Sequence, residues 1–196
     1  MTTHPPKILA FAGSTRTDSY NKKLVRLSAE AARSNGAEVT LIDLRDFSMP
    51  IYDGDLEEKE GLPPNAVKLK SLFLDHQGLL LSCPEYNSSI SGVLKNTIDW
   101  LSRQNPKNPK EKPLACFSGK IASLLSASPG ALGGLRGLVT IRSIFGNIGT
   151  IVLPDQLAVP KAHEAFDDQG HLKDPKQQAV LERIAKTLVE TARRLT

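Results

Sequence analysis

The feature that most constrains the fold is a series of short apolar runs separated by longer amphipathic segments. Residues 7–12 (KILAFA) and 78–82 (GLLLS) are almost wholly apolar and lack the alternation of polar and apolar side chains that a half-exposed strand shows. A strand without that alternation is buried on both faces, and such strands are typical of parallel sheets. The chain is therefore expected to build a parallel sheet.

The segment after the first run has the period of an amphipathic helix. Between residues 19 and 35, Leu24, Leu27 and Ala31 share one face, and Gly36 ends the pattern. Residues 44–64 contain Asp, Glu, Gly and three prolines with almost no periodicity, and are expected to form a long loop. The same reasoning predicts strands at 7–12, 37–43, 78–82, 121–127 and 150–153, and helices at 19–35, 65–75, 92–101, 134–147 and 177–195.

Strand and helix alternate five times, and this alternation predicts a single α/β domain. The expected architecture is a three-layer α/β/α sandwich around a five-stranded parallel sheet, with right-handed crossovers. A chain of 196 residues fits one domain spanning residues 5–196, since no linker and no internal repeat interrupts the pattern. In such folds ligands bind beyond the carboxyl ends of the strands, where the strand order reverses. The loops after the first, third and fourth strands are therefore the candidate functional sites.

The first of these loops runs from Gly13 to Asn21 (GSTRTDSYN), between a buried strand and a helix. It offers hydroxyl groups, the cation of Arg16 and the backbone amides of a helix N-terminus, which together favour an anion such as phosphate. Neither GxGxxG nor GxxxxGKS/T occurs here, so the dinucleotide and P-loop fingerprints are absent. From residue types alone, a simple helix cap by Asp18 or Ser19 explains this loop equally well.

The other two loops carry different chemistry. In residues 83–92 (CPEYNSSISG), Pro84 ends the third strand, Tyr86 supplies a flat ring with a polar tip, and the amides at Ser91 and Gly92 open a helix. This arrangement suits a planar heterocycle that gains negative charge. Residues 126–134 (SASPGALGG) contain three glycines, which allow the backbone to approach a ligand closely. An ordinary turn explains this third loop equally well.

The composition excludes several other classes of protein. Hydrophobic residues make up 40% and charged residues 23%, as in a soluble globular protein rather than a disordered or membrane one. The start of the chain shows no signal peptide, and two cysteines are too few for a disulfide framework, so a cytoplasmic setting is expected. Cys83 is more simply a buried apolar residue than a reactive thiol. The net charge of +4 suits a small anionic ligand, and with only 5% aromatic residues neither a nucleic acid nor a membrane partner is expected.

Two further groups of residues are interpreted as structural. His163, His171 and the carboxylates between them fit neither an HExxH helix nor an EF-hand loop, and the segment Asp168 to Gly170 is typical of a turn, so no metal is expected. No GxSxG elbow occurs, which disfavours a Ser–His–Asp hydrolase. Trp100 lies on the apolar face of its helix and is expected in the core or in an interface.

Together, the three loop sequences resemble one protein family. GSTRTDSYN, PEYNSSISGVLKNTIDWLSR and SASPGALGG follow, in order and at similar spacing, the patterns GSxRxxSxN, PEYNxSxPGxLKNxIDW and SASPGxxGG of the NADPH-dependent FMN reductases. These flavodoxin-like proteins include quinone, chromate and azo-dye reductases. The resemblance runs from about Lys7 to the final helix, including the segment HEAFDDQGHLKD. Ser88 stands where the family commonly has glycine and Ser91 where it has proline, so the backbone over the flavin ring is expected to differ slightly.

The resemblance implies a fold, a cofactor and a set of ligands. The fold would be flavodoxin-like, with strand order 2-1-3-4-5, and the cofactor FMN, with NADPH or NADH as electron donor. No side chain is expected to act as an acid or base, because N5 of FMN is the reactive centre. The implied ligands are Ser14, Arg16, Ser19 and Asn21 for the phosphate, Pro84, Glu85, Tyr86 and Asn87 along the isoalloxazine, and Ser128 and Gly130 at its opposite edge.

The activity that the resemblance implies is ping-pong hydride transfer from NAD(P)H to FMN and on to a quinone, azo compound, metal oxyanion or free flavin. One domain leaves no room for a separate nicotinamide domain, so donor and acceptor are expected to share the flavin face. A homodimer or homotetramer is expected, with residues 44–64 or the Trp100 helix as candidate contacts. The alternative is a flavodoxin-like electron carrier, or a redox-regulatory flavoprotein without NAD(P)H turnover. The positive net charge favours the enzyme, because flavodoxins are typically acidic.

Overall fold

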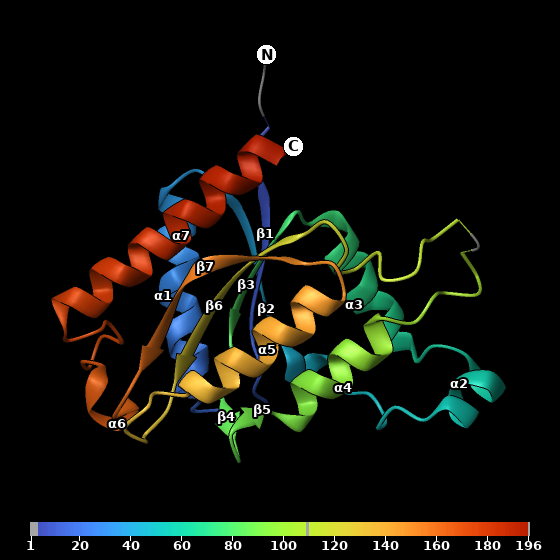
Figure 1. The fold of residues 1–196 in the computed structure, drawn as a ribbon, viewed down its shortest axis with the longest axis horizontal. Helices are drawn as coiled ribbons and strands as arrows, with labels where there is room; N and C mark the ends of the chain where they lie inside the picture. Colours follow the sequence, from blue (N-terminus) through green and yellow to red (C-terminus); the bar gives the residue numbers. More distant parts are fainter. Residues whose placement is uncertain (1–3, 109, 196) are drawn as a thin grey trace.

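A five-stranded parallel sheet forms the centre of the molecule in the computed structural model, which describes residues 4–108 and 110–195 (Figure 1). Its strand order is β2-β1-β3-β6-β7, which is 2-1-3-4-5 when the strands of this sheet are counted along the chain. The predicted fold class and strand order are therefore confirmed. The strands are β1 (Lys7–Ala12), β2 (Glu38–Asp43), β3 (Gly78–Ser82), β6 (Ile121–Ala127) and β7 (Ile151–Val159).

Helices cover both faces of the sheet. On one face lie α1 (Tyr20–Ser34) and α7 (Pro175–Leu195), which pack against each other. On the other face lie α3 (Pro64–Asp75), α4 (Gly92–Leu101) and α5 (Leu135–Asn147), as Figure 1 shows. Within the described residues, no helix combines the length and the apolar character needed to cross a membrane.

The apolar character of β1 follows from its place in the middle of these layers. Leu9 and Phe11 belong to the core under α3, α4 and α5, whereas Ile8 and Ala10 belong to the core under α1 and α7. Successive side chains of a strand point to opposite faces, so a strand covered on both sides needs apolar residues at every position. The absence of alternation in the sequence has this cause.

The prediction of a long loop at residues 44–64 is wrong. The structure has a 3-10 helix, η1 (Leu44–Phe47), and a short helix, α2 (Gly54–Glu60), in this segment. Both begin at an aspartate whose side chain accepts a hydrogen bond from the backbone two residues later, Asp43 from Arg45 and Asp53 from Asp55. No residue of α2 is buried, so this helix carries no apolar stripe that periodicity could detect.

Three smaller elements also differ from expectation. The strands β4 (Glu85–Tyr86) and β5 (Ser89–Ile90) form an antiparallel hairpin, and α6 (Ala162–Ala165) follows the last strand. The strand expected at 150–153 continues to Val159, through Pro154. Because β7 is an edge strand, a proline there need not remove a hydrogen bond between strands.

Candidate functional site

Three loops meet at one edge of the sheet, where the carboxyl ends of β1, β3 and β6 lie side by side (Figure 1, lower edge). A shallow pocket opens between them, as expected at the point where the strand order reverses. Its lining contains every residue named above as a ligand except Asn87 and Gly130. The lining residues are Ser14, Arg16, Ser19, Tyr20, Asn21, Pro84, Glu85, Tyr86, Ala127, Ser128 and Pro129.

The loop between β1 and α1 presents unpaired donors at a helix N-terminus. Ser19 occupies the N-cap position of α1, but its side chain makes no capping hydrogen bond. Arg16 is exposed and, within the described parts of the chain, forms no ion pair. Ser19 therefore stands at the cap position, as the helix-cap explanation predicts, but its hydroxyl group does not cap the helix. A free hydroxyl, a free guanidinium and a helix N-terminus form the kind of donor set that binds an anion.

Arg45 stabilises this loop through hydrogen bonds, a role that was not predicted from the sequence. Its guanidinium donates to the carbonyl oxygen of Thr15, with Nε at 2.9 Å, and Nη2 also donates to Oγ1 of Thr17 at 3.0 Å. The two partners lie 30 and 28 residues away in the sequence. No local pattern marks such a contact, which exists because η1 follows the neighbouring strand β2.

Asn21 joins three elements through its buried amide. Its Nδ2 donates to the carbonyl of Ala127 at 2.9 Å, and its Oδ1 accepts from the backbone N–H of Ala127 at 3.0 Å and from Oγ of Ser82 at 2.8 Å. Asn21 was expected to bind phosphate, and it does line the pocket. Its amide oxygen, however, is already engaged with the ends of β3 and β6.

The carboxylate of Glu85 is paired with the start of α5. It accepts from Arg136, with Nε at 2.9 Å and Nη2 at 2.6 Å, and from the backbone N–H of Gly137 at 3.1 Å. Desolvation alone would raise the pKa of Glu85, but these hydrogen bonds and the positive charge of Arg136 hold it below its ordinary value. At neutral pH Glu85 is therefore an ionised anchor for the β4–β5 hairpin and poorly suited to donate a proton.

The turn of that hairpin has an unusual backbone. Asn87 and Ser88 have φ values of 52° and 66°, so both adopt the left-handed conformation that two-residue hairpin loops of type I′ require. Glycine is favoured in this region, which explains why the family commonly has glycine where this chain has Ser88. Tyr86, just before the turn, is 50% exposed and presents its ring at the mouth of the pocket.

Ser91 links the start of α4 to the end of β1. Its Oγ donates to the carbonyl of Gly13 at 2.6 Å and accepts from the N–H of Leu94 at 3.3 Å. This serine therefore caps α4, which a proline side chain cannot do. Neither Ser91 nor Gly92 is among the residues that line the pocket in the described chain.

The glycines after β6 allow a close approach within the protein itself. A Cβ atom on Gly134, where φ is 89°, would lie 1.9 Å from Oγ of Ser126, which in turn donates to the carbonyl of Cys83 at 2.6 Å. A Cβ atom on Gly133 would lie 2.7 Å from the backbone of Val159. These glycines hold the loop against β6 and β7, so that Ser128 can reach the pocket.

The remaining candidates are structural. Cys83 is fully buried, and burial raises the pKa of its thiol far above the ordinary range, which leaves it unreactive. Trp100 is also fully buried, with its indole N–H donating to the carbonyl of Pro50 at 2.8 Å, so its side chain lies in the core. Asp167 accepts hydrogen bonds from the backbone of Gln169 and His171, which confirms a turn in this segment.

The arrangement fits a flavin mononucleotide. One part of the lining offers helix amides with the Ser19 hydroxyl and the Arg16 guanidinium, which have no side-chain cap bond and no ion pair among the described residues, for a phosphate dianion. Another part offers the Tyr86 ring and the β4–β5 hairpin for a planar ring system. The two ends are held at a fixed spacing, because Asn21 and Ser91 tie the loops together through hydrogen bonds.

Comparison with known proteins agrees with this geometry. A family model described as NADPH-dependent FMN reductase matches residues 6–164. An NAD(P)H-dependent FMN reductase of Pseudomonas aeruginosa is 34% identical over 191 residues, 96% of each chain. A probable NADPH:quinone oxidoreductase 2 of Oryza sativa subsp. japonica is 33% identical over 196 residues, 96% of this chain and 90% of that protein. The solved structure of FerB, a flavoenzyme NAD(P)H:(acceptor) oxidoreductase from Paracoccus denitrificans, has a TM-score of 0.79 at 25% identity, covering 96% of this chain and 98% of that one. The chain belongs to the NADPH-dependent FMN reductase family.

Proposed function

We propose that FMN binds in the pocket at the ends of β1, β3 and β6. The observation that carries this proposal is a pair of donors at the N-terminus of α1: among the described residues the Ser19 hydroxyl makes no capping bond and the Arg16 guanidinium no ion pair. In this arrangement Ser14, Arg16 and Ser19 hold the phosphate. The residues Pro84, Glu85, Tyr86 and Asn87 lie along the isoalloxazine, and Ser128 and Gly130 lie at its opposite edge.

Asn21 has a different role in this proposal. Its amide oxygen and one Nδ2 hydrogen are engaged with Ser82 and Ala127, so it positions the loop of residues 13–21, the phosphate loop, against the strands, while its second Nδ2 hydrogen stays available to the phosphate. Glu85 likewise contributes through its backbone, because its carboxylate is held by Arg136 and Gly137.

The proposed reaction is ping-pong transfer from NAD(P)H to a small acceptor. When bound, FMN supplies hydride-transfer chemistry between the two substrates. The protein contributes orientation and electrostatics: helix amides and Arg16 hold the phosphate, and Tyr86 flanks the ring at an open pocket. One shared, open site requires the oxidised nicotinamide to leave before the acceptor binds. The acceptor classes that fit are quinones, azo compounds, metal oxyanions and free flavins.

Steady-state kinetics with FMN-loaded protein tests the reaction. Each acceptor class is assayed against varied NADPH and varied NADH, and parallel double-reciprocal lines are expected for a ping-pong reaction. Intersecting lines would contradict a shared site. If NADPH does not bleach the bound flavin, the protein is an electron carrier instead.

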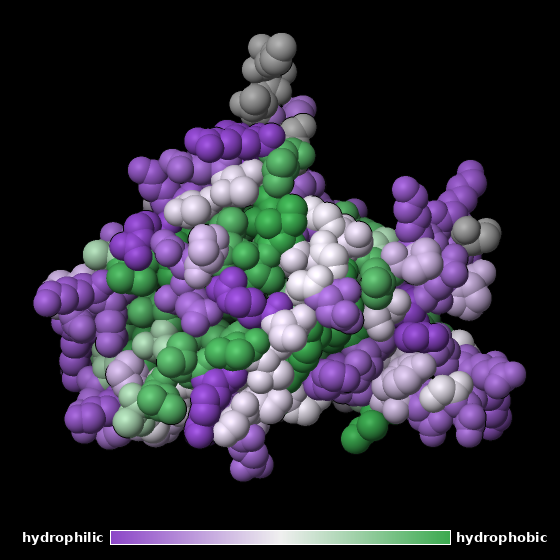
Figure 2. All heavy atoms as spheres, in the orientation of Figure 1, coloured by the Kyte–Doolittle hydropathy of each residue, from purple (hydrophilic) through white to green (hydrophobic). Residues whose placement is uncertain are grey.

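We also propose that the chain forms a homodimer or a homotetramer. Apolar side chains are exposed in two separate places. One is Ile51, 84% exposed within residues 44–64. The other is the face formed by α5 and the start of β7, where Leu135, Val139 and Ile151 are exposed; Figure 2 shows apolar groups on this face with polar side chains between them. Two such surfaces are what a dimer of dimers needs. Multi-angle light scattering tests this, and a monomer at all concentrations would contradict it.

A cytoplasmic location is part of the same proposal. Both cysteines are free and buried, as in proteins of a reducing compartment. Cell fractionation is the test, and recovery of the protein in a secreted or membrane fraction would contradict it.

A further inference from the structure

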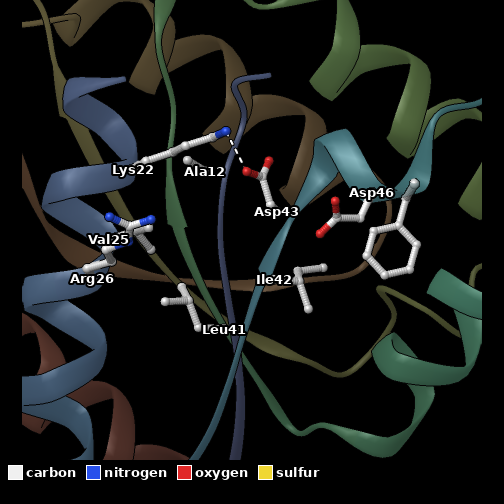
Figure 3. A pocket seen from close by; sticks show the side chains of 9 residues that line it. Ala12, Lys22, Val25, Arg26, Leu41, Ile42, Asp43 and Asp46 are labelled. Atoms are coloured by element: carbon white, nitrogen blue, oxygen red, sulfur yellow. Dashed lines mark hydrogen bonds and ion pairs between the residues drawn. The ribbon is translucent and has the colours of Figure 1, made fainter. Parts of the chain in front are cut away.

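A second pocket lies beside the proposed flavin site, at the same edge of the sheet. It has a volume of about 360 Å³ and opens between α1 and the carboxyl ends of β1 and β2 (Figure 3). This volume is large enough for a nucleoside and lies within the usual range of small-ligand pockets. Its lining residues are Ala12, Lys22, Val25, Arg26, Leu41, Ile42, Asp43, Asp46 and Phe47.

The walls of this pocket combine apolar surface with charged groups. Ile42 and Phe47, on the side of β2 away from α1, provide apolar contact for a planar base, and Val25 and Leu41 line the side that faces α1. Figure 3 shows Lys22 extending from α1 to Asp43 at the end of β2, with Arg26 beside it on the same helix and Asp46 on the opposite side. Such a mixed lining is typical of sites that bind the polar rim and the apolar faces of one ligand.

Only some of the charged side chains that line this pocket form ion pairs within the protein. Nζ of Lys22 pairs with Asp43 at 2.5 Å, and the other carboxylate oxygen of Asp43 accepts from the backbone of Arg45 at 3.0 Å. Arg26 is exposed and, in the residues that the structure describes, has no ion-pair partner. The carboxylate of Asp43 is thus neutralised inside the protein. Arg26 is left as a cation for a bound anion, and Asp46, likewise exposed and without an ion-pair partner in the described residues, is left as an acceptor for a hydrogen-bond donor.

This pocket and the proposed flavin site are both lined by the first turns of α1. Lys22 follows Ser19 by three residues on α1, and Arg26 lies one further turn along the same helix. Arg45, between Asp43 and Asp46, holds Thr15 and Thr17 of the loop. A dinucleotide has a pyrophosphate between its two rings. With its nicotinamide over the flavin, its other end therefore has to lie beyond one end of the flavin site.

We propose that this pocket binds the 2′-phosphoadenosine half of NADPH. The inference rests on the proposed FMN site and adds the determinant of donor choice. The adenine packs against Phe47 and Ile42, Asp46 accepts a hydrogen bond from its amino group, and Arg26 binds the 2′-phosphate. NADH lacks that phosphate, so Arg26 selects NADPH over NADH.

Calorimetric titration of FMN-loaded protein with 2′,5′-ADP and with 5′-ADP tests the site without turnover. The parent protein is expected to bind 2′,5′-ADP more tightly, and Arg26→Ala to weaken that binding about tenfold, the size of one charge-assisted contact. The same variant should raise KM for NADPH about tenfold and leave KM for NADH within twofold. Lys23→Ala is the matched control, since it removes one exposed cation from the same helix but lies outside the pocket lining.

The outcomes separate this inference from the proposed function. If both variants weaken 2′,5′-ADP alike, or if 2′,5′-ADP does not compete with NADPH while NADPH still reduces the flavin, the adenosine site is refuted and the FMN site stands. If the protein does not retain FMN at all, the proposed function itself fails.

Discussion

At the scale of single residues, two serines near the pocket have opposite relations to the protein around them. Both occupy the N-cap position of a helix, Ser19 for α1 and Ser91 for α4. The Ser91 hydroxyl makes two hydrogen bonds within the protein, whereas that of Ser19 makes no capping bond. Equivalent positions thus contribute to stability in one case and, in the proposed site, to ligand binding in the other.

This contrast predicts different effects of removing each hydroxyl. Ser19→Ala should lower the affinity for FMN about tenfold, the size of a hydrogen bond to a charged group, with little change in the stability of the flavin-free protein. Ser91→Ala, the matched control, should instead lower the free energy of unfolding by about 1 kcal/mol through loss of its cap. Fluorescence titration with FMN and urea unfolding measure the two quantities. An unchanged FMN affinity in Ser19→Ala would contradict the phosphate assignment.

The strained turn at Ser88 gives a second prediction. Its φ of 66° lies in the left-handed region, which costs a non-glycine residue about 1–2 kcal/mol. Ser88→Gly should therefore raise the free energy of unfolding by about 1 kcal/mol, since glycine's greater freedom in the unfolded chain offsets part of the gain. Ser89→Gly, in the neighbouring strand β5, should lower it. Destabilisation by both substitutions in urea unfolding would show that the turn is not strained.

At the scale of elements, the edge of the sheet is held by side chains that join distant parts of the chain. Asn21 and Ala127 lie 106 residues apart, and the amide of Asn21 connects α1 to β6 and, through Ser82, to β3. Arg45 and Glu85 make comparable connections, from η1 to the phosphate loop and from β4 to α5. The geometry of the pocket therefore depends on contacts between elements more than on any one loop.

If Asn21 positions the loops, its removal should lower the free energy of unfolding even in the flavin-free protein. Asn21→Ala leaves a buried backbone N–H, a buried carbonyl and the Ser82 hydroxyl unpaired, which should cost about 3 kcal/mol of unfolding free energy in the flavin-free protein. FMN affinity should fall as well. A residue that only bound phosphate would leave the stability of the flavin-free protein unchanged, and that result in thermal or urea unfolding would overturn the positioning role.

The contact between Glu85 and α5 predicts a dependence on pH. The folded-state pKa of Glu85 is depressed, so its contribution is fully present above the ordinary glutamate pKa of about 4.3 and is lost as the pH falls through the lower folded value. Glu85→Gln should cost about 1 kcal/mol of unfolding free energy at pH 7 and progressively less below pH of about 4. Urea unfolding at several pH values measures this, and a difference that stays constant or grows in acid would contradict the ion pair.

The elements themselves were largely predictable from the sequence. The strands β1, β2, β3 and β6 and the helices α1, α3, α4, α5 and α7 were predicted within one or two residues, because each has an apolar face that must be buried; β7 was predicted six residues too short at its end. The helix α2 was not predicted, because Leu56 is its one apolar residue packed against the core, too few for a periodic pattern, and because it depends on a local cap. The loops of the site were predicted because ligands in such folds bind beyond the carboxyl ends of the strands. The roles of Asn21, Arg45 and Glu85 were not, since their partners are remote in sequence.

At the scale of the whole molecule, two pockets lie along one edge of a single rigid sheet and are both backed by α1. One is proposed to hold FMN and the other the far end of its electron donor. Both are flanked by arginines without ion-pair partners in the described residues, Arg16 and Arg26. Although the net charge is only +4, these two positive charges therefore lie where phosphate groups are expected to bind. This placement is consistent with one domain that binds both substrates on the same face.

Anaerobic stopped-flow mixing with NADPH tests the central claim, that this edge of the sheet holds an FMN which NADPH reduces. The purified protein is loaded with FMN, freed of excess flavin, and mixed while the absorbance of the flavin is followed. We expect a yellow protein whose flavin band bleaches at a rate that saturates with NADPH, and in Arg16→Ala a smaller amplitude of bleaching, because weaker FMN retention leaves less bound flavin. A colourless protein that takes up no added FMN, or a bound flavin that NADPH does not bleach, would contradict it.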